Sequence, residues 1–288
     1  MSIFAIIIRL LNALIMLAVP VFGALIFVKQ TKIGWRLFGI GAVTFLAAQL
    51  FHIPFNIFCL SPFLEWAGLE LSEGGISLVI VSLVLGLSAG VFEETARYLV
   101  YRYWLKKEQS WAEGTLLGLG HGGVESMLVG VLAFYALAQA FVLRGGNLGD
   151  YVSPEQIELA QTQLTAYWNM PWHTVILGAV ERLAAMSFHV GASVIVLQVF
   201  KRDNAVWLWV AIAWHTLLDG VVVFGAQSLG IYATEAFVVL FGALSLWFAF
   251  LLCDKENGEN SAESLLTPEI SRVDFEVTSN ELDDSRYG

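Results

Sequence analysis

Two adjacent glutamates and a nearby arginine are the side chains in this sequence best suited to chemistry. Glu93, Glu94 and Arg97 are the only charged residues in the apolar stretch from Gly75 to Val100, which is long enough to cross a membrane as a helix. An ionisable group at membrane depth costs roughly 2.5–3.5 kcal/mol on insertion scales. Two neighbouring carboxylates at that cost indicate a functional site, and the alternative is a buried ion pair that only fixes helix packing.

Helical geometry places these three charges on two faces. Glu93 and Arg97 are four residues apart, so they share a face and can pair. Glu94 points about 100° away from Glu93, onto the face that carries Gly86 and Gly90. Because small residues allow two helices to approach closely, we expect Glu94 to contact a neighbouring helix.

Histidines, acids and glycines recur at helical spacing in the apolar stretches that follow. Three polar pairs are separated by four or seven residues: His121 with Glu125, Arg182 with His189, and His215 with Asp219. The members of each pair share a helix face. A stripe of Gly114, Gly118 and Gly122 beside His121 predicts another close helix contact. A single histidine in a helix is usually a packing residue, but so many polar groups in consecutive stretches favour one common site.

These residue types suit two kinds of hydrolytic chemistry. Carboxylates beside neutral imidazoles in a sequestered pocket can activate water as general bases, and imidazoles on another helix can stabilise an oxyanion. Three histidines and a carboxylate are also a zinc ligand set, here His121, Glu125, His189 and His215. No His-Glu-x-x-His motif is present, so the spacing gives zinc no specific support. Both a metal-free site and a site with a divalent metal such as zinc stay open.

The composition indicates an integral membrane protein. Hydrophobic residues make up 57% of the chain and the mean hydropathy is +0.70, which is not typical of a soluble domain. Seven apolar segments are long enough to span a bilayer: Ile3–Val28, Trp35–Leu60, Gly75–Val100, Thr115–Leu143, Trp172–Phe200, Val206–Phe224 and Ile231–Leu252. The predicted fold class is all-α, a polytopic membrane helix bundle of about seven transmembrane helices in residues 1–253, with its core at 75–224. The two cysteines provide no disulfide framework, and no basic patch predicts nucleic-acid binding.

The distribution of Lys and Arg predicts the orientation. These residues follow the first, third and fifth segments: Lys29, Lys32, Arg36, Arg102, Lys106, Lys107, Lys201 and Arg202. Positive loops stay in the cytoplasm, so the N-terminus is predicted outside and the C-terminus cytoplasmic. Residues 254–288 hold ten Asp and Glu against three Lys and Arg, a net charge of −7, and are predicted to form an acidic disordered cytoplasmic tail.

Depth along the predicted helices supports a single polar layer. At about 1.5 Å per residue, Glu93 lies roughly 11 Å from the cytoplasmic end of its segment. The same rise puts His121, His189 and His215 about 10 to 16 Å from that side, although their helices run in opposite directions. One site in the cytoplasmic half of the bundle is therefore predicted.

Three features are predicted near the outer surface. Ser153-Pro154-Glu155-Gln156 reads as a helix start with Ser153 as the cap, and this helix would stiffen the loop before the fifth segment. Glu181 and Arg182 fall outside the polar layer, so a structural or interfacial role is predicted for them. Arg9 lies close enough to the end of the first segment to extend its charge to the surface.

An ordered set of motifs carries a resemblance to a known superfamily. The motifs are Glu93-Glu94-Thr95-Ala96-Arg97, His121-x-x-x-Glu125, Glu181-Arg182 with His189, and His215-x-x-x-Asp219. From about Gly75 to Gly220 the chain resembles the YhfC family of intramembrane proteases. That family is related to PrsW, the CAAX prenyl proteases and the bacteriocin-processing proteins (the CPBP superfamily). The CAAX prenyl protease pattern differs in two places, because its Arg comes where this chain has Tyr98 and its second motif is Phe-x-x-x-His.

The resemblance implies an intramembrane endopeptidase that hydrolyses a peptide bond of a membrane-embedded or lipid-anchored substrate. Carried over by position, Glu93 is the base that activates water, Glu94 and Arg97 orient Glu93, and His215 with Asp219 contributes contacts on the oxyanion side. Either His121 or Glu125 fills the second-motif role. Some members of the superfamily are metalloproteases, so the cofactor stays open. The resemblance also implies a multi-pass protein of a bacterial plasma membrane.

Two other function classes fit the same residues. A proton- or ion-coupled transporter also places Glu, Asp and His at mid-membrane, but the sequence has no two-fold internal repeat and no paired Gly/Pro-broken helices. A non-catalytic membrane scaffold with a regulatory acidic tail is the third reading. Metal content, together with activity measured with and without a chelator, distinguishes most sharply among these alternatives.

Overall fold

The structure of the protein is a computed structural model that describes residues 2–253. The longer helices are α1 (Ile3–Thr31), α2 (Arg36–Phe55), α4 (Gly75–Leu99), α5 (Trp111–Gly145), α6 (Ile157–Asn169), α7 (Trp172–Lys201), α8 (Val206–Ser228) and α9 (Ile231–Leu251). Short helices fill most of the remainder: the π-helices Asn56–Leu60 and Val100–Trp104, α3 (Ser61–Trp66), and the 3-10 turns Leu71–Glu73, Leu148–Asp150 and Pro154–Gln156. No strand occurs within residues 2–253. The all-α prediction is confirmed, while the predicted acidic tail, 254–288, lies outside the described residues.

Seven helical segments among the described residues are long and apolar enough to cross a membrane, as predicted. Six of them extend beyond their predicted bounds, the second and the fourth by the most residues. The second runs past Leu60 to Trp66, because a π turn continues the helix and Pro62, which has no N–H to satisfy, sits in the first turn of α3. The fourth begins at Trp111, where Ser110 and Glu113 form a capping box that satisfies the first backbone donors.

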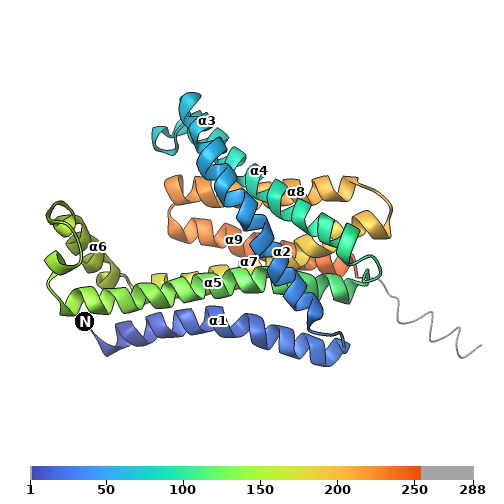
Figure 1. Cartoon of the computed structure of the whole chain (residues 1–288), viewed down its shortest axis with the longest axis horizontal. Helices are drawn as coiled ribbons and strands as arrows, with labels where there is room; N and C mark the ends of the chain where they lie inside the picture. The colour runs from blue at the N-terminus through green and yellow to red at the C-terminus, as the bar shows by residue number, and fades with distance from the viewer. Residues whose placement is uncertain (1, 254–288) are drawn as a thin grey trace, which may run out of the picture. The chain divides into compact units, whose positions relative to one another are not determined.

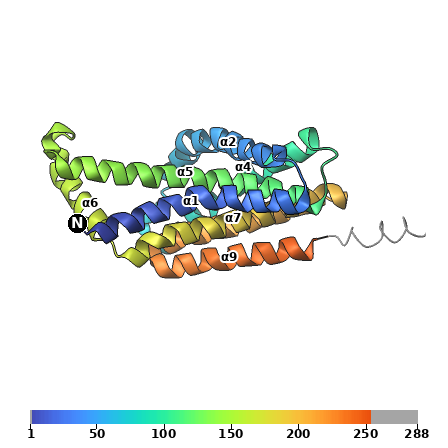
Figure 2. The same ribbon diagram turned by 90° about the horizontal axis from the view of Figure 1, so that it is seen from below.

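Helix α7 forms the core of the bundle. In Figure 2, α1, α5, α7 and α9 run side by side, and α7 contacts each of the other three. Its residues from Phe188 to Val199 are all buried, as expected for a helix that is mostly apolar around its circumference and is surrounded by other helices. Helix α4 packs along α8, and α2 lies across α4 and α5 (Figure 1). The polar residues of α4, α5 and α8 can therefore meet those of α7.

Glycines set close helix contacts on two seams that border the polar residues. A Cβ added at Gly118 of α5 would lie 2.6 Å from Cα of Val190 in α7, and one at Gly122 would lie 2.9 Å from the ring of His189. On the other seam, a Cβ at Gly86 of α4 would lie 2.5 Å from the backbone oxygen of Thr216 in α8. Both predicted small-residue contacts are confirmed, and they bring the polar faces of α5 and α4 against α7 and α8.

The end of the bundle that carries α6 differs from the prediction in two details. Helix α6 exists but begins at Ile157, after a 3-10 turn at Pro154–Gln156, and the Ser153 side chain makes no capping bond. Arg9 does not extend to the surface: it is 5% exposed and donates to the carbonyls of Ala5 and Tyr167. The reason is that the end of α6 lies over α1, with Arg9 stacked on the Tyr167 ring at 4.6 Å.

Candidate active site and metal centre

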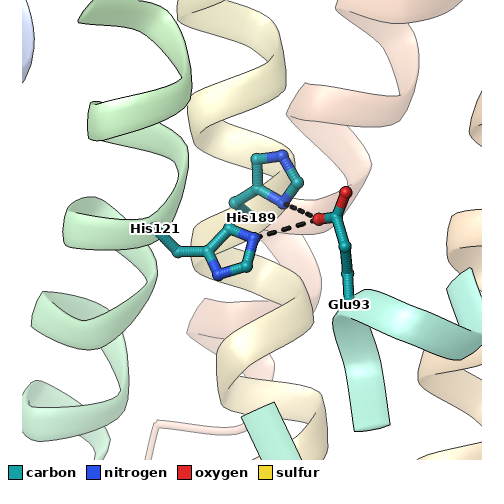
Figure 3. Close-up of side chains that lie close together, drawn as sticks. All are labelled: Glu93, His121 and His189. Carbon is teal, nitrogen blue, oxygen red and sulfur yellow. Dashed lines mark hydrogen bonds and ion pairs between the residues drawn. The ribbon is translucent and has the colours of Figure 1, made fainter. Parts of the chain in front are cut away.

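One carboxylate oxygen of Glu93 is the point on which three imidazoles converge. Nε2 of His121 donates to Oε2 of Glu93 at 3.0 Å, while Nδ1 of His189 and Nε2 of His215 each lie 4.0 Å from the same oxygen. The rings come from α5, α7 and α8, and the glutamate from α4. Figure 3 shows His121 and His189 both directed at this oxygen.

The cluster is removed from solvent and lipid. Glu93 is 6% exposed and His121, His189 and His215 are between 0% and 4% exposed. A buried carboxylate is costly unless it is paired and hydrogen-bonded. The second oxygen, Oε1, accepts a hydrogen bond from Nε2 of Gln49 in α2 at 2.9 Å, so both oxygens of Glu93 are engaged.

Glu94 and Arg97 support the cluster from the side of α4 that faces α8. Oε1 of Glu94 accepts from Arg97 and from Nδ1 of His215, the latter at 2.6 Å. The predicted contact of Glu94 with a neighbouring helix is confirmed. Arg97 also donates to Nδ1 of His189 at 2.7 Å. The predicted pairing of Arg97 with Glu93 is present only at 3.7 Å, because Glu94, one position nearer on the helix, takes the closer contact.

A second acid lies behind His189. Oε2 of Glu125 accepts from Nε2 of His189 at 2.6 Å, and Oε1 accepts from Arg182 at 2.6 Å. Arg182 in turn pairs with Glu181. The prediction that Glu181 and Arg182 lie apart from the site is therefore wrong. Their backbone is about 10 Å along the helix from His189, but Glu125 contacts both Arg182 and His189 and so connects them.

Asp219 borders the cluster on α8. Its Oδ2 lies 3.6 Å from Nε2 of His215, and its side chain is 36% exposed. It faces a cavity of about 100 Å³ whose lining includes Glu93, Glu125, Glu181, Arg182, His189, His215 and Asp219. With His121, Glu94 and Arg97 in contact with these groups, all eight predicted site residues lie in one connected set.

Sequence reasoning missed the contribution of α2. Besides Gln49, His52 belongs to a polar cluster: its Nε2 lies 3.0 Å from Oγ of Ser88 and 3.0 Å from Nδ2 of Asn56. Gln49, His52 and Asn56 are spaced at three and four residues on one face of an apolar helix. This spacing was the available signal, and it is weaker than that of a charged residue because an uncharged amide costs less to bury.

The donor atoms are compatible with a divalent metal. Single ligand atoms of Glu93, His121 and His189 all lie within 4.8 Å of one another. Oxygen and imidazole nitrogen ligands lie about 2.0–2.2 Å from zinc, so two ligands of one ion are separated by at most about twice that distance. Oε2 of Glu93 lies 3.0 Å from Nε2 of His121 and 4.0 Å from Nδ1 of His189, within that limit. Glu125 behind His189 is the carboxylate–histidine arrangement common around metals. The group differs from the predicted set in two ways: Glu93 takes the place of Glu125, and His215 is not part of it.

Two contacts would have to change if a metal were bound. Nδ1 of His189 accepts a hydrogen bond from Arg97, which would have to release it. His121 would have to carry its proton on Nδ1, an atom that is buried and has no hydrogen-bond partner among the described residues. The donor types and spacing fit, and Arg97 is the residue that opposes metal binding.

The site is thus a buried Glu/His cluster inside an all-helical bundle of membrane-spanning segments, and comparison with known proteins assigns the family. Residues 15–241 match the model of the YhfC intramembrane metalloprotease family, so the chain belongs to that family. It is 29% identical over 222 residues to the uncharacterized membrane protein YhfC of Bacillus subtilis (strain 168), covering 74% of this chain and 83% of the relative. No solved structure gives a significant match.

The family assignment agrees with the resemblance carried by the sequence motifs. The matched region contains all eight predicted site residues. The chain is therefore a multi-pass membrane protein of a membrane-protease family whose description includes a metal.

Proposed function

We propose that this protein is an intramembrane endopeptidase in which the Glu93 cluster hydrolyses a peptide bond of a membrane-embedded or lipid-anchored substrate. The observation that carries the proposal is the convergence of three imidazole nitrogens on Oε2 of Glu93, at 3.0 to 4.0 Å, in a buried pocket. A carboxylate that accepts a proton and imidazoles that donate hydrogen bonds are the two requirements of general-base peptide hydrolysis.

In the metal-free form of this mechanism, Glu93 takes a proton from the attacking water. Gln49 and His121 hold its two oxygens in place. His215 donates its Nδ1 proton to Glu94, which leaves Nε2 directed into the cavity. When His215 is also protonated on Nε2, this atom donates to the developing oxyanion, with Asp219 beside it. Glu125 holds His189 in the same way from the opposite side.

In the metal-dependent form, Glu93, His121 and His189 would hold the ion. A divalent metal at this position would polarise the scissile carbonyl and lower the pKa of a bound water. Glu93 would then act as a ligand, and Arg97 would pair with Glu94 alone. We infer that residues 1–253 form the protease domain and that residues 254–288 form an acidic cytoplasmic tail.

The decisive test is Glu93→Gln in purified protein reconstituted into liposomes with a mixture of transmembrane and lipid-anchored peptides. This change keeps the size of the side chain and one accepting oxygen but removes proton acceptance, so cleavage detected by mass spectrometry should fall about 10²–10⁴-fold. Glu65→Gln, an exposed glutamate outside the cluster, is the matched control. Wild-type cleavage rates in Glu93→Gln would reject the proposal, and proton flux in sealed vesicles would then test the transporter alternative.

Metal content separates the two forms of the mechanism. In the metal-dependent form the wild-type protein carries about one ion per chain, chelation abolishes cleavage, and His121→Ala loses the ion. In the metal-free form a chelator leaves cleavage unchanged, and Glu93→Gln still removes it.

A further inference from the structure

We propose that water and substrate reach the Glu93 cluster only from the end of the bundle that carries α6, and that the opposite end is closed by packed apolar side chains. This inference rests on the proposed function for its meaning. The cavities, the apolar core and the direction of the helices indicate the route independently of that function.

The cavity at the cluster extends in one direction. Helix α5 runs toward α6 and helix α7 runs away from it (Figure 2). Glu125 follows His121 on α5, and Arg182 precedes His189 on α7, so both acid and arginine lie on the α6 side of the imidazoles. The cavity wall on α8 continues in the same direction, from His215 through Asp219 to Val222.

A second cavity continues the route toward α6. It has a volume of about 280 Å³ and shares Glu181 with the first cavity. Its lining includes Tyr167 of α6 and Met170 just after it, together with Arg9 and Glu235. Polar groups therefore line a path from the end of the bundle to Glu93, as an aqueous route through a membrane protein requires.

The opposite end of the cluster is closed. Leu105, Leu116, Leu117 and Leu197 are fully buried and Tyr101 is 1% exposed, and all five belong to one apolar core. Tyr101 is one turn from Arg97, and Leu117 is one turn from His121. The Tyr101 hydroxyl donates to the carbonyl of Ser193 on α7, which ties this layer to the core helix. Because these side chains are buried in one apolar core, they leave no passage for water.

The closed end is the one that carries the basic loops. The Lys and Arg residues that follow the first, third and fifth spans lie at that end, so it faces the cytoplasm under the positive-inside rule. Glu93 thus lies nearer the cytoplasmic end of its helix, but its cavity opens toward the other side. The depth of a residue along its helix and the side from which its cavity opens are separate properties. The sequence predicted only the depth.

The dimensions of the route restrict the substrate. An α-helix with side chains is about 10–12 Å wide, which a cavity of about 100 Å³ cannot contain. The segment that reaches Glu93 must therefore be extended, with its backbone amides bonded to polar groups of the lining. The substrate class is a membrane-anchored protein whose cleavage segment unwinds at the outer surface. Arg182, held between Glu125 and Glu181, is the side chain that this segment must pass.

Cysteine accessibility tests the route without relying on proteolysis. In a Cys59→Ser, Cys253→Ser background, single cysteines are placed by Val222→Cys in the cavity wall and by Val196→Cys in the closed core. Gln161→Cys on α6 and Lys106→Cys in the basic loop report the two sides, since both positions are exposed. A charged, membrane-impermeant methanethiosulfonate is added to one side of sealed vesicles, and labelling is read by mass.

We expect Val222→Cys to be labelled from the side that labels Gln161→Cys, and Val196→Cys to remain unlabelled from both sides. Labelling of Val222→Cys from the Lys106 side, its protection from both sides, or labelling of Val196→Cys would each overturn the proposal. Failure of the wild-type protein to cleave any peptide would reject the proposed function but leave the labelling result intact. Folded yield by size-exclusion chromatography verifies each variant.

Discussion

Two carboxylate–histidine pairs flank Glu93, and they have the same contact length but different surroundings. Glu94 accepts from His215 at 2.6 Å, and Glu125 accepts from His189 at 2.6 Å. Glu94 is fully buried, whereas the Glu125 side chain is 21% exposed. The arginine beside Glu94 comes from the same helix, while Glu125 pairs with Arg182 of another helix.

The difference indicates a division of labour. Arg97 is three residues from Glu94, so α4 itself forms that ion pair and the partner position is set by helix geometry. The contact of Glu125 with Arg182 joins α5 to α7 and borders the cavity, where a substrate could displace it. The inner pair, Glu94 with His215, is suited to rigid positioning. The outer pair, Glu125 with His189, can respond to a substrate that enters the cavity.

The largest expected effect comes from removing the acid of the inner pair. Glu94→Gln leaves Arg97 without its closest anion in a fully buried site, and breaking a buried ion pair costs about 3–5 kcal/mol. We expect a large drop in folded yield and in the thermal midpoint in detergent. Glu125→Gln, the matched change in the outer pair, should lower both much less. Equal losses in the two variants would contradict the division proposed above.

The imidazole of the inner pair should matter most for turnover. His215→Ala removes a group placed to donate to the oxyanion, and losing one such donor costs about 10²–10³-fold in kcat. KM should change little, because the contact strengthens in the transition state. His173→Ala, an exposed histidine away from the cluster, serves as the control. If His215→Ala instead raises KM at unchanged kcat, the ring binds substrate in its ground state.

The outer pair should show an intermediate effect through Arg182. Removing its contacts with Glu125 and Glu181 loses hydrogen bonds between charged groups, each contributing about 1.5–3 kcal/mol. Arg182→Ala should therefore lower kcat/KM at least about tenfold, and Arg182→Lys should restore part of it by keeping the charge. Steady-state cleavage assays measure both variants. Unchanged kcat/KM in Arg182→Ala would show that the outer pair has no part in catalysis or entry.

The residues predicted from sequence were those whose burial is expensive. Glu93, Glu94 and His215 stood out because charged or titratable groups in apolar helices are rare. The spacing of Glu94 with Gly86 and Gly90 correctly predicted contact with a neighbouring helix, which is α8 in the structure. Gln49 was missed because a single amide carries no such cost. Whether a residue was predicted therefore depended on the hydration free energy that its side chain loses on burial.

Positions across helices could not be predicted in the same way. The rise per residue locates the backbone, so it placed Arg182 outside the site although its side chain reaches Glu125. Spacing showed that His121 and Glu125 share a face, but it could not show that Glu93 lies nearest His121 and Glu125 lies behind His189. These pairings depend on how closely α5 packs against α7, which cannot be read from the local sequence.

The smallest effect is expected at an exposed pair of the same chemical type, which provides the reference for Glu94 and Arg97. Arg36 donates to Oε1 of Glu108 at 2.8 Å, and the Arg36 side chain is 58% exposed. This hydrogen bond holds the pKa of Glu108 below its usual value, so the pair stabilises the fold at neutral pH and loses this contribution as the pH falls through that lowered pKa. Solvent screening limits it to less than about 1 kcal/mol. Arg36→Ala should therefore shift the thermal midpoint only slightly at pH 7, and the shift should vanish in acid and in high salt. A loss as large as that of Glu94→Gln would mean that burial is not what distinguishes the two ion pairs.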